Sequence, residues 1–176
     1  MRLATLVTGY RRLSSGLSSV SVLLPAIILV ACSSAEDAIQ AKNIEAVKLQ
    51  HTEVWSKGNV SIVPEIYAED FIAHAPGGRL VRGRDGIKSM VENHRRAFPD
   101  WNEEIERILV DGEFVVTQFR STGTHKGPFL GYPATGNSID ITETCIYRLE
   151  NGSIAEQWIY PDTASLRNQL SGHPDE

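Results

Sequence analysis

Two stretches of the chain carry apolar residues three or four positions apart, the spacing of one face of a helix. The first comprises Ile44, Val47, His51, Val54 and Trp55, and the second comprises Ile87, Met90, Val91, His94 and Phe98. We therefore predict one helix that ends at Gly58 and another that begins near Asp85 and ends before Pro99, which cannot continue a helical hydrogen-bond ladder. Between them, Asn59 is expected to cap a short helix, and residues 67–76 predict a strand before a Pro-Gly-Gly loop.

The pattern changes from residue 102 onward, where apolar and polar residues alternate along four long segments. The predicted strands cover about residues 102–111, 114–125, 137–150 and 153–161, and residues 162–170 return to helical spacing. Strands of that length favour a strongly curved sheet, and helices followed by a run of antiparallel strands are typical of the α+β class. We expect a cone-shaped barrel in which the curved antiparallel sheet wraps over the N-terminal helices and leaves a pocket inside.

The strongest local signal is Asn151-Gly152 between the last two strands, a pair typical of a two-residue hairpin turn. Uninterrupted pairing from this turn places Tyr147 opposite Glu156 and Cys145 opposite Trp158. Because side chains alternate along a strand, one face then carries Ile141, Glu143, Cys145, Tyr147, Leu149, Ile154, Glu156, Trp158, Tyr160 and Asp162. Aromatic rings with a few carboxylates are more typical of a ligand pocket than of a plain core, so we expect this face to line the pocket.

Asp162 has two compatible interpretations at this stage. It precedes Thr-Ala-Ser-Leu at the start of the last predicted helix, and aspartate is a preferred helix N-cap. It also shares the predicted pocket face with Trp158, where burial would raise the pKa of a carboxyl group and make it a better base. A cap without chemistry and a base in a pocket both remain open.

The histidines and two phenylalanines complete the candidate pocket. His74 and His125 stand near strand ends, where they are either pocket residues or ordinary exposed histidines. His51 and His94 fall on the apolar helical stripes, where packing or a buried hydrogen bond is expected. The predicted pocket lining is Trp158, Glu156, Tyr147, Tyr160, Phe119 and Phe98.

The N-terminal segment differs from the rest in charge and composition. It contains three arginines, no acidic residue before Glu36, and an apolar and small-residue stretch that ends in LVACSS. This pattern predicts a bacterial lipoprotein signal peptide over residues 1–31, with Cys32 carrying the lipid and residues 32–43 forming a tether. A transmembrane anchor is the alternative, but Pro25 interrupts the run, whose most apolar part is shorter than the roughly 20 residues of a span. We expect an exported protein, lipid-anchored to a bacterial membrane on the periplasmic or cell-surface side.

The rest of the chain is acidic, because the signal segment holds three of the 17 basic residues and none of the 22 acidic ones, which leaves a net charge of −8. Without clusters of lysine or arginine, such a domain is not expected to bind nucleic acid. With Cys32 lipidated, Cys145 has no cysteine to pair with in the same chain. The sequence also lacks CxxC and closely spaced histidines, so no zinc site is expected.

Three stretches carry distinctive motifs. They are GTHKGPFLGYPATG at 123–136, RAFPDW at 96–101, and YRLENGSIAEQW with the helix that follows it at 147–170. Together they resemble the SnoaL-like polyketide cyclase (ester cyclase) family, which belongs to the nuclear transport factor 2-like superfamily. The family pattern Glu-x-Trp-x-x-x-Asp matches Glu156, Trp158 and Asp162. The resemblance covers about residues 44–172, which we take as the domain.

This resemblance implies a mechanism and an assembly. It implies that Asp162 acts as general base, removing an acidic proton so that the carbanion closes a ring by intramolecular aldol attack. It implies assistance by His74 and His125, no metal or organic cofactor, an apolar small molecule as substrate, and a homodimer formed through the sheet. The alternative is a membrane-anchored binding module that captures an apolar ligand without catalysis.

Overall fold

The structure is a computed structural model that describes the backbone of residues 23–172 and the side chains of residues 36–172. The chain divides into two compact units, residues 1–35 and 36–176, and the second contains the candidate site. Residues 1–22, most of the predicted signal peptide, and the side chain of Cys32 lie outside the described residues, so cleavage and lipidation stay predictions. In the described part of the chain, no helix is long and apolar enough to cross a membrane.

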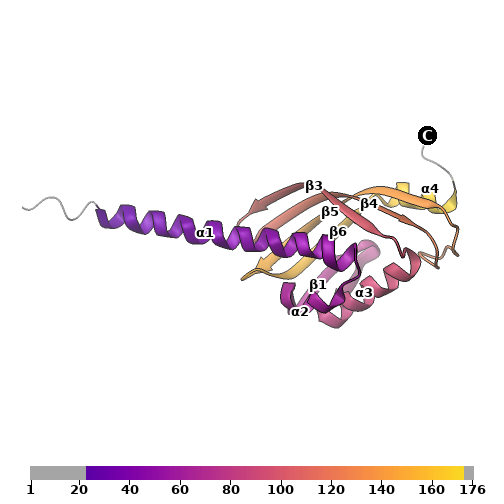
Figure 1. Cartoon of the computed structure of the whole chain (residues 1–176), viewed down its shortest axis with the longest axis horizontal. Helices are drawn as coiled ribbons and strands as arrows, with labels where there is room; N and C mark the ends of the chain where they lie inside the picture. Colours follow the sequence, from indigo (N-terminus) through magenta and orange to yellow (C-terminus); the bar gives the residue numbers. More distant parts are fainter. Residues whose placement is uncertain (1–22, 173–176) are drawn as a thin grey trace, which may run out of the picture. The chain divides into compact units, whose positions relative to one another are not determined.

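In the described chain, helices and the strands β1 and β2 precede a run of long strands (Figure 1). The elements in order are α1 (Leu23–Leu49), the π-helical turn η1 (Gln50–Trp55), the 3₁₀ turn η2 (Val60–Ile62), α2 (Val63–Ile66), β1 (Tyr67–Ala75), the 3₁₀ turn η3 (Pro76–Gly78), β2 (Arg79–Arg82), α3 (Gly83–Ala97), β3 (Asn102–Asp111), β4 (Phe114–Thr124), β5 (Ser138–Glu150), β6 (Ser153–Pro161) and α4 (Thr163–Ser171). Strands β3 and β6 have the predicted bounds, and β4 and β5 agree with theirs to within one residue.

The helix ends follow from local chemistry, with one correction. Gly58 adopts a positive φ of 71°, which ends the first helical segment as predicted. Asn59 precedes η2, but its side chain makes no capping hydrogen bond and instead accepts from the Ser61 hydroxyl at 2.6 Å. The predicted Asn59 cap is therefore wrong, because a nearer side-chain donor occupies its oxygen. Helix α3 ends before Pro99, as predicted.

The sheet has six strands in the order β2-β1-β6-β5-β4-β3. All neighbouring strands are antiparallel except β1 and β6, which run parallel. The edge strands β2 and β3 are not neighbours, so the sheet is open rather than closed into a barrel. Figure 1 shows α2 and α3 on one side of the strands, and α3 contacts β1 and β2 while α4 contacts β5. The predicted α+β class and curved sheet over N-terminal helices are confirmed, with one parallel pair that was not predicted.

A β-bulge in β6 overturns part of the predicted register. Pairing begins as expected, with Leu149 opposite Ile154, but Arg148 then lies opposite Glu156. Ala155 is therefore an extra residue, and both it and Ile154 are buried. Beyond the bulge every side chain of β6 lies on the opposite face from the one predicted, because side chains alternate with a period of two residues.

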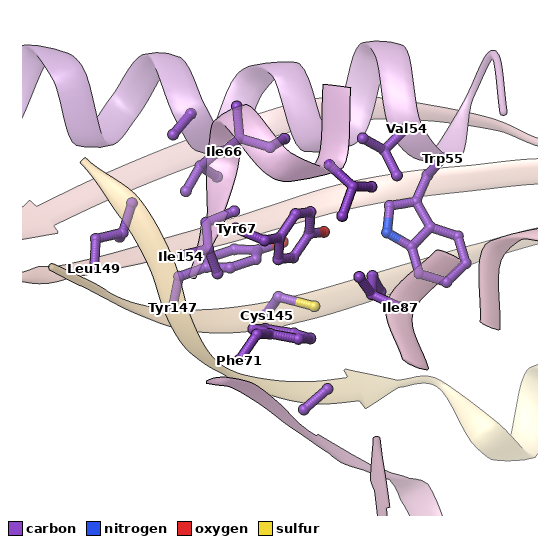
Figure 2. Close-up of a cluster of buried hydrophobic side chains, with 14 of the residues drawn as sticks. Val54, Trp55, Ile66, Tyr67, Phe71, Ile87, Cys145, Tyr147, Leu149 and Ile154 are labelled. Atoms are coloured by element: carbon purple, nitrogen blue, oxygen red, sulfur yellow. The ribbon is translucent and has the colours of Figure 1, made fainter. Parts of the chain in front are cut away.

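The core lies between the helices and one face of the sheet, which we call the inner face. Figure 2 shows Val54, Trp55 and Ile87 from the helical elements meeting side chains of β1, β5 and β6. A second cluster comprises Ala97, Phe98, Trp101, Ile139, Ile141, Leu166 and Leu170. Burying an apolar side chain of this size contributes about 1.5–3 kcal/mol, so both clusters stabilise the fold strongly.

Candidate active site

A cavity of about 830 Å³ opens on the inner face of the sheet. Its walls take residues from both apolar clusters, so it lies between them: Trp55, Phe119 and Cys145 from the first, and Phe98, Trp101, Ile141 and Leu166 from the second. This volume lies within the roughly 300–1,000 Å³ typical of sites for small organic molecules. The predicted pocket inside the curved sheet is present.

The π-helical turn η1 determines which side chains reach this cavity. The amide of Ser56 donates to the carbonyl oxygen of His51 at 3.0 Å, five residues back, and widens the last helical turn. Gln50 and Trp55 then line the cavity, while His51 lies behind it and is fully buried. Arg95 donates to the carbonyl oxygens of Trp55, Ser56 and Trp101, which ties this turn to the FPDW stretch.

A buried hydrogen-bonded chain runs from the cavity wall into the core. The Glu103 carboxyl lines the cavity, and its Oε2 lies 2.6 Å from Nδ1 of His51. Nε2 of His51 lies 3.0 Å from the Tyr147 hydroxyl and 3.2 Å from the Thr117 hydroxyl. The Trp101 indole N–H donates to the other Glu103 oxygen at 3.1 Å. These contacts fix the carboxyl of Glu103 in one orientation, and they confirm the buried hydrogen bond expected for His51.

Glu143 is a second carboxyl in the same cavity. It lies on β5 between Ile141 and Cys145 on the inner face, as the predicted alternation required, and it is half-buried. Burial, and after it the negative charge of Glu103, raises the pKa of Glu143 to about 7. Near neutral pH this carboxyl therefore exchanges a proton readily, which is the property a general acid–base group needs.

His94 faces the cavity from α3 within a cage of aromatic rings. Its ring centroid lies 4.4 Å from that of Trp101, 5.1 Å from Phe98 and 5.3 Å from Phe129. Burial, and to a smaller extent the charge of Arg95, lowers the pKa of His94 to about 3, so the ring is neutral. This is the apolar helix stripe expected for His94, but it also forms part of the cavity wall.

Two buried glutamines of the cavity wall carry hydrogen-bond acceptors that have no partner among the described residues. Gln50 is 1% exposed and Gln157 is 2% exposed, and both line the cavity. Among the described residues, the Oε1 atom of each has no hydrogen-bond partner. The Gln157 amide donates to the sulfur of Cys145 at 3.4 Å, and burial raises the pKa of that thiol. Buried acceptors without a partner are rare in proteins and are costly unless a ligand or water satisfies them.

Three of the predicted pocket residues lie at the cavity wall or directly behind it. Phe98 and Phe119 line the cavity, as predicted. Tyr147 lies on the inner face and is fully buried, but it contacts His51 behind the cavity wall rather than the cavity itself.

The residues predicted on β6 lie elsewhere, because the bulge at Ala155 turns them to the outer face of the sheet. Trp158 stacks on His74 with ring centroids 5.1 Å apart, and Nε2 of His74 lies 2.7 Å from Glu156. Tyr160 is 55% exposed. The prediction that Glu156, Trp158 and Tyr160 line the pocket with Tyr147 is wrong for this geometric reason. His74, Trp158 and Glu156 form a cluster of their own, and His74, Trp158 and Tyr160 line a shallow depression beside it.

His125 is not brought into the cavity either. It is fully buried, its Nδ1 lies 2.9 Å from the Thr135 hydroxyl, and its ring stacks on Phe98. The side chain therefore supports the Gly-rich loop and the back of Phe98. Any role in catalysis would act through Phe98 rather than by contact with a bound molecule.

Asp162 lies at the start of α4 and is exposed. Its carboxylate accepts a hydrogen bond from the Ser165 amide at 3.0 Å, so the predicted N-cap is confirmed. Its neighbours Pro161 and Thr163 line the cavity, but Asp162 does not. Its role as general base stays a prediction, and the Asp162 carboxylate does not line the cavity.

Comparison with known proteins places the chain in a family. The sequence profile of SnoaL-like polyketide cyclases matches residues 45–170, so the chain belongs to this family. No curated protein matches the chain. The predicted homodimer and lipid anchor are not tested by these likenesses and stay predictions.

Solved structures agree with this assignment. A candidate SnoaL-like polyketide cyclase of Jannaschia sp. CCS1 is 26% identical with a TM-score of 0.72, covering 77% of this chain and 96% of that one. IdmH, a candidate polyketide cyclase of Streptomyces antibioticus, is 26% identical with a TM-score of 0.65, covering 73% and 98%. A candidate polyketide cyclase of Acidithiobacillus ferrooxidans is 29% identical with a TM-score of 0.66, covering 75% and 96%. The fold is thus the nuclear transport factor 2-like cone with a pocket for a small molecule.

Proposed function

We propose that this protein catalyses cofactor-free proton transfer at a carbon next to a carbonyl group, in an aldol-type ring closure or an isomerisation, with Glu143 as the proton-transferring base. The single observation that carries the proposal is the position of Glu143. It is a half-buried carboxyl on the wall of an 830 Å³ cavity, and its pKa is about 7. A base with this pKa is half ionised at neutral pH and is stronger than an ordinary carboxylate.

The neighbouring groups support this role. The Glu103 carboxyl is held in place by hydrogen bonds to His51 and the Trp101 indole. Its negative charge therefore stays near Glu143 and helps to keep the pKa of that carboxyl raised. The apolar residues of the walls lower the polarity around Glu143, which strengthens electrostatic interactions there. The neutral ring of His94, whose Nε2 has no partner among the described residues, lines the same cavity beside the developing enolate.

A deuterium-exchange assay tests the proposal without knowledge of the natural substrate. The probe is 2-tetralone, a neutral bicyclic ketone whose C1 protons exchange slowly with D₂O, and the loss of their ¹H NMR signal is followed with and without protein. Glu143→Gln preserves the shape of the side chain but cannot accept a proton. We expect it to lower the protein-catalysed exchange rate by about 10²–10⁴-fold.

Asp162→Asn is the matched control, because it makes the same chemical change at the carboxylate that the family resemblance identified. If Glu143 is the base, this variant exchanges the probe at the wild-type rate. Loss of exchange in Asp162→Asn with full exchange in Glu143→Gln would overturn our assignment and restore Asp162 as base. Binding of the probe without exchange in the wild-type protein would favour the alternative, a binding module without catalysis.

A further inference from the structure

The cavity is asymmetric in charge between its deep end and its mouth, and this asymmetry bears on the ligand. The buried and half-buried lining residues define the deep end, where Glu103, Glu143, Gln50 and Gln157 present oxygen atoms. The exposed lining residues define the mouth. They are Pro76, Gly77, Arg79, Asn93, Arg96, Pro128, Leu130 and Arg167.

Every charged residue of this mouth is an arginine. Arg79 lies at the start of β2, Arg96 in the last turn of α3 and Arg167 in α4, so three separate elements each contribute an arginine to the exposed lining. Within the described part of the chain, none of the three forms an ion pair with a carboxylate. The chain as a whole has a net charge of −5, so the positive charge of this mouth is opposite in sign to the net charge of the protein.

Asp162, which lies beside two lining residues in the sequence, does not neutralise the mouth by pairing. Asp162 lies between the lining residues Pro161 and Thr163, but its carboxylate is bound to the Ser165 amide. Arg96 donates to the Asn93 side chain and keeps further N–H groups available, since a guanidinium carries five donors. Guanidinium groups match oxyanions such as carboxylates in geometry and charge.

The deep end offers hydrogen-bond acceptors instead of donors, so it favours a ligand group that donates a hydrogen bond. The Oε1 atoms of Gln50 and Gln157 are almost completely buried and have no partner among the described residues. A hydroxyl group of a ligand would donate to them and remove the cost of leaving them unpaired. Between the two ends, the walls are the aromatic and aliphatic side chains that already define the cavity.

We infer that the ligand of this cavity is an anionic, hydroxylated compound with an apolar body, held with its hydroxyl group at Gln50 and Gln157 and its oxyanion at Arg79, Arg96 and Arg167. This inference rests on the proposed function, because it names the substrate class of the same site. It distinguishes a free acid from the corresponding neutral ester, which would leave the three arginines without a partner.

Three related probes test both ends of the cavity by isothermal titration calorimetry. The first is 6-hydroxy-2-naphthoate, which has a hydroxyl group, a flat apolar body and a carboxylate. The second is its methyl ester, which lacks the charge, and the third is 2-naphthoate, which lacks the hydroxyl group. We expect the hydroxy acid to bind about tenfold more tightly than either analogue, the size of effect that a hydrogen bond to a charged or buried group produces.

Variants assign the effect to the residues. Arg79→Gln combined with Arg167→Gln should weaken the hydroxy acid about tenfold and leave the ester unchanged. Arg82→Gln is the control, since Arg82 is an exposed arginine of the same strand as Arg79 and does not line the cavity. Gln157→Leu should abolish the advantage of the hydroxy acid over 2-naphthoate. The inference is overturned if the ester binds as tightly as the acid, or if the arginine variants weaken both equally.

The same titrations in Glu143→Gln separate this inference from the proposed function. Binding does not require the proton-transferring carboxyl, so this variant should keep the preference for the acid over the ester. If the wild-type protein shows that preference but no deuterium exchange, the ligand class is correct and the catalytic proposal fails. If exchange occurs but acid and ester bind alike, the catalytic proposal stands and the ligand class is wrong.

Discussion

Glu143 lies in β5 and Asp162 directly follows β6, and the two carboxyl groups have opposite environments. Glu143 on β5 pairs with Pro161 on β6, and Asp162 is the next residue along the chain, whose amide donates to the carbonyl oxygen of Thr142 at 3.1 Å. One carboxyl lines the mainly apolar cavity beside a second carboxyl. The other is exposed and is held by the first turn of a helix.

The comparison shows that the environment, and not the kind of side chain, assigns the chemistry. Within the cavity, low polarity and the neighbouring charge of Glu103 disfavour ionisation, so the pKa of Glu143 is raised to about 7. At the helix start, the carboxylate of Asp162 satisfies a backbone N–H that would otherwise lack a partner. The first arrangement is suited to moving protons and the second to stabilising a helix.

The largest expected effect is on the pH dependence of catalysis. As a base, Glu143 must be deprotonated, so the exchange rate of 2-tetralone should rise with pH and level off above about 7. At pH 5 only about 1% of a group with this pKa is ionised, so we expect a rate about hundredfold below the plateau. The measurement is the rate of exchange by ¹H NMR between pH 5 and 8.5, corrected for buffer catalysis. A flat profile across this range would contradict Glu143 as base.

Glu103→Leu should produce the next largest effect, on stability. This change leaves Nδ1 of His51 and the indole N–H of Trp101 buried without their acceptor, and each orphaned group costs about 1–3 kcal/mol. We expect the free energy of unfolding in urea to fall by about 2 kcal/mol or more. Glu103→Gln is the control, since its side-chain oxygen still accepts from Trp101.

Glu103→Gln also sharpens the comparison between the two carboxyl groups. It removes the negative charge that raises the pKa of Glu143, so the midpoint of the pH–rate profile should move to lower pH. The stability and the profile are measured on the same preparation. A midpoint that does not move would mean that Glu103 plays no part in setting the basicity of Glu143.

The sequence predicted the scaffold of the site better than the site itself. Alternating residues gave the bounds of β3 and β6, and Asn151-Gly152 placed the hairpin tip correctly. The bulge at Ala155 was not predictable, because β6 continues with two polar residues and then two apolar ones. Such a pattern does not distinguish the two faces of a strand. The residues of β5, where alternation is regular, were assigned to the correct face.

Long-range partners were also beyond the reach of the sequence pattern. Glu103 is the second residue of β3 and has charged neighbours, and nothing local marks it as the partner of His51, 52 positions away. The parallel pairing of β1 with β6 brings His74 against Trp158 and Glu156 on the outer face. Pairings of this kind depend on the sheet order, which alternation does not encode. The site became visible only when the fold brought Glu103 and Glu143 to one cavity.

The pH dependence of stability gives a smaller and independent test of Glu143. Below about pH 4.5 the carboxyl is protonated in both the folded and the unfolded chain, and above about pH 7 it is ionised in both. Between these values only the unfolded chain is ionised, so the free energy of unfolding contributed by this group falls as pH rises. His94, with a pKa lowered to about 3, acts in the opposite direction, since below pH 6.5 only the unfolded chain gains its proton.

The difference between wild type and Glu143→Gln isolates the first contribution, because His94 is common to both proteins. We expect the stability of the variant relative to wild type to increase from pH 5 to pH 8, as measured by urea unfolding at each pH. A difference that stays constant over this window would show that the pKa of Glu143 is not raised in the folded protein.

The smallest effect is expected at Asp162, and it distinguishes a cap from a base. Asparagine caps helices about as well as aspartate, so Asp162→Asn should leave the free energy of unfolding nearly unchanged. Asp162→Ala removes the acceptor of the Ser165 amide and should cost about 1 kcal/mol, measured by urea unfolding. Neither variant should change the exchange rate of 2-tetralone, because the carboxylate does not line the cavity. If Asp162→Asn is as stable as wild type but loses exchange, then Asp162 contacts the substrate in solution. The proposed division of roles, with Glu143 as base and Asp162 only as helix cap, would then be wrong.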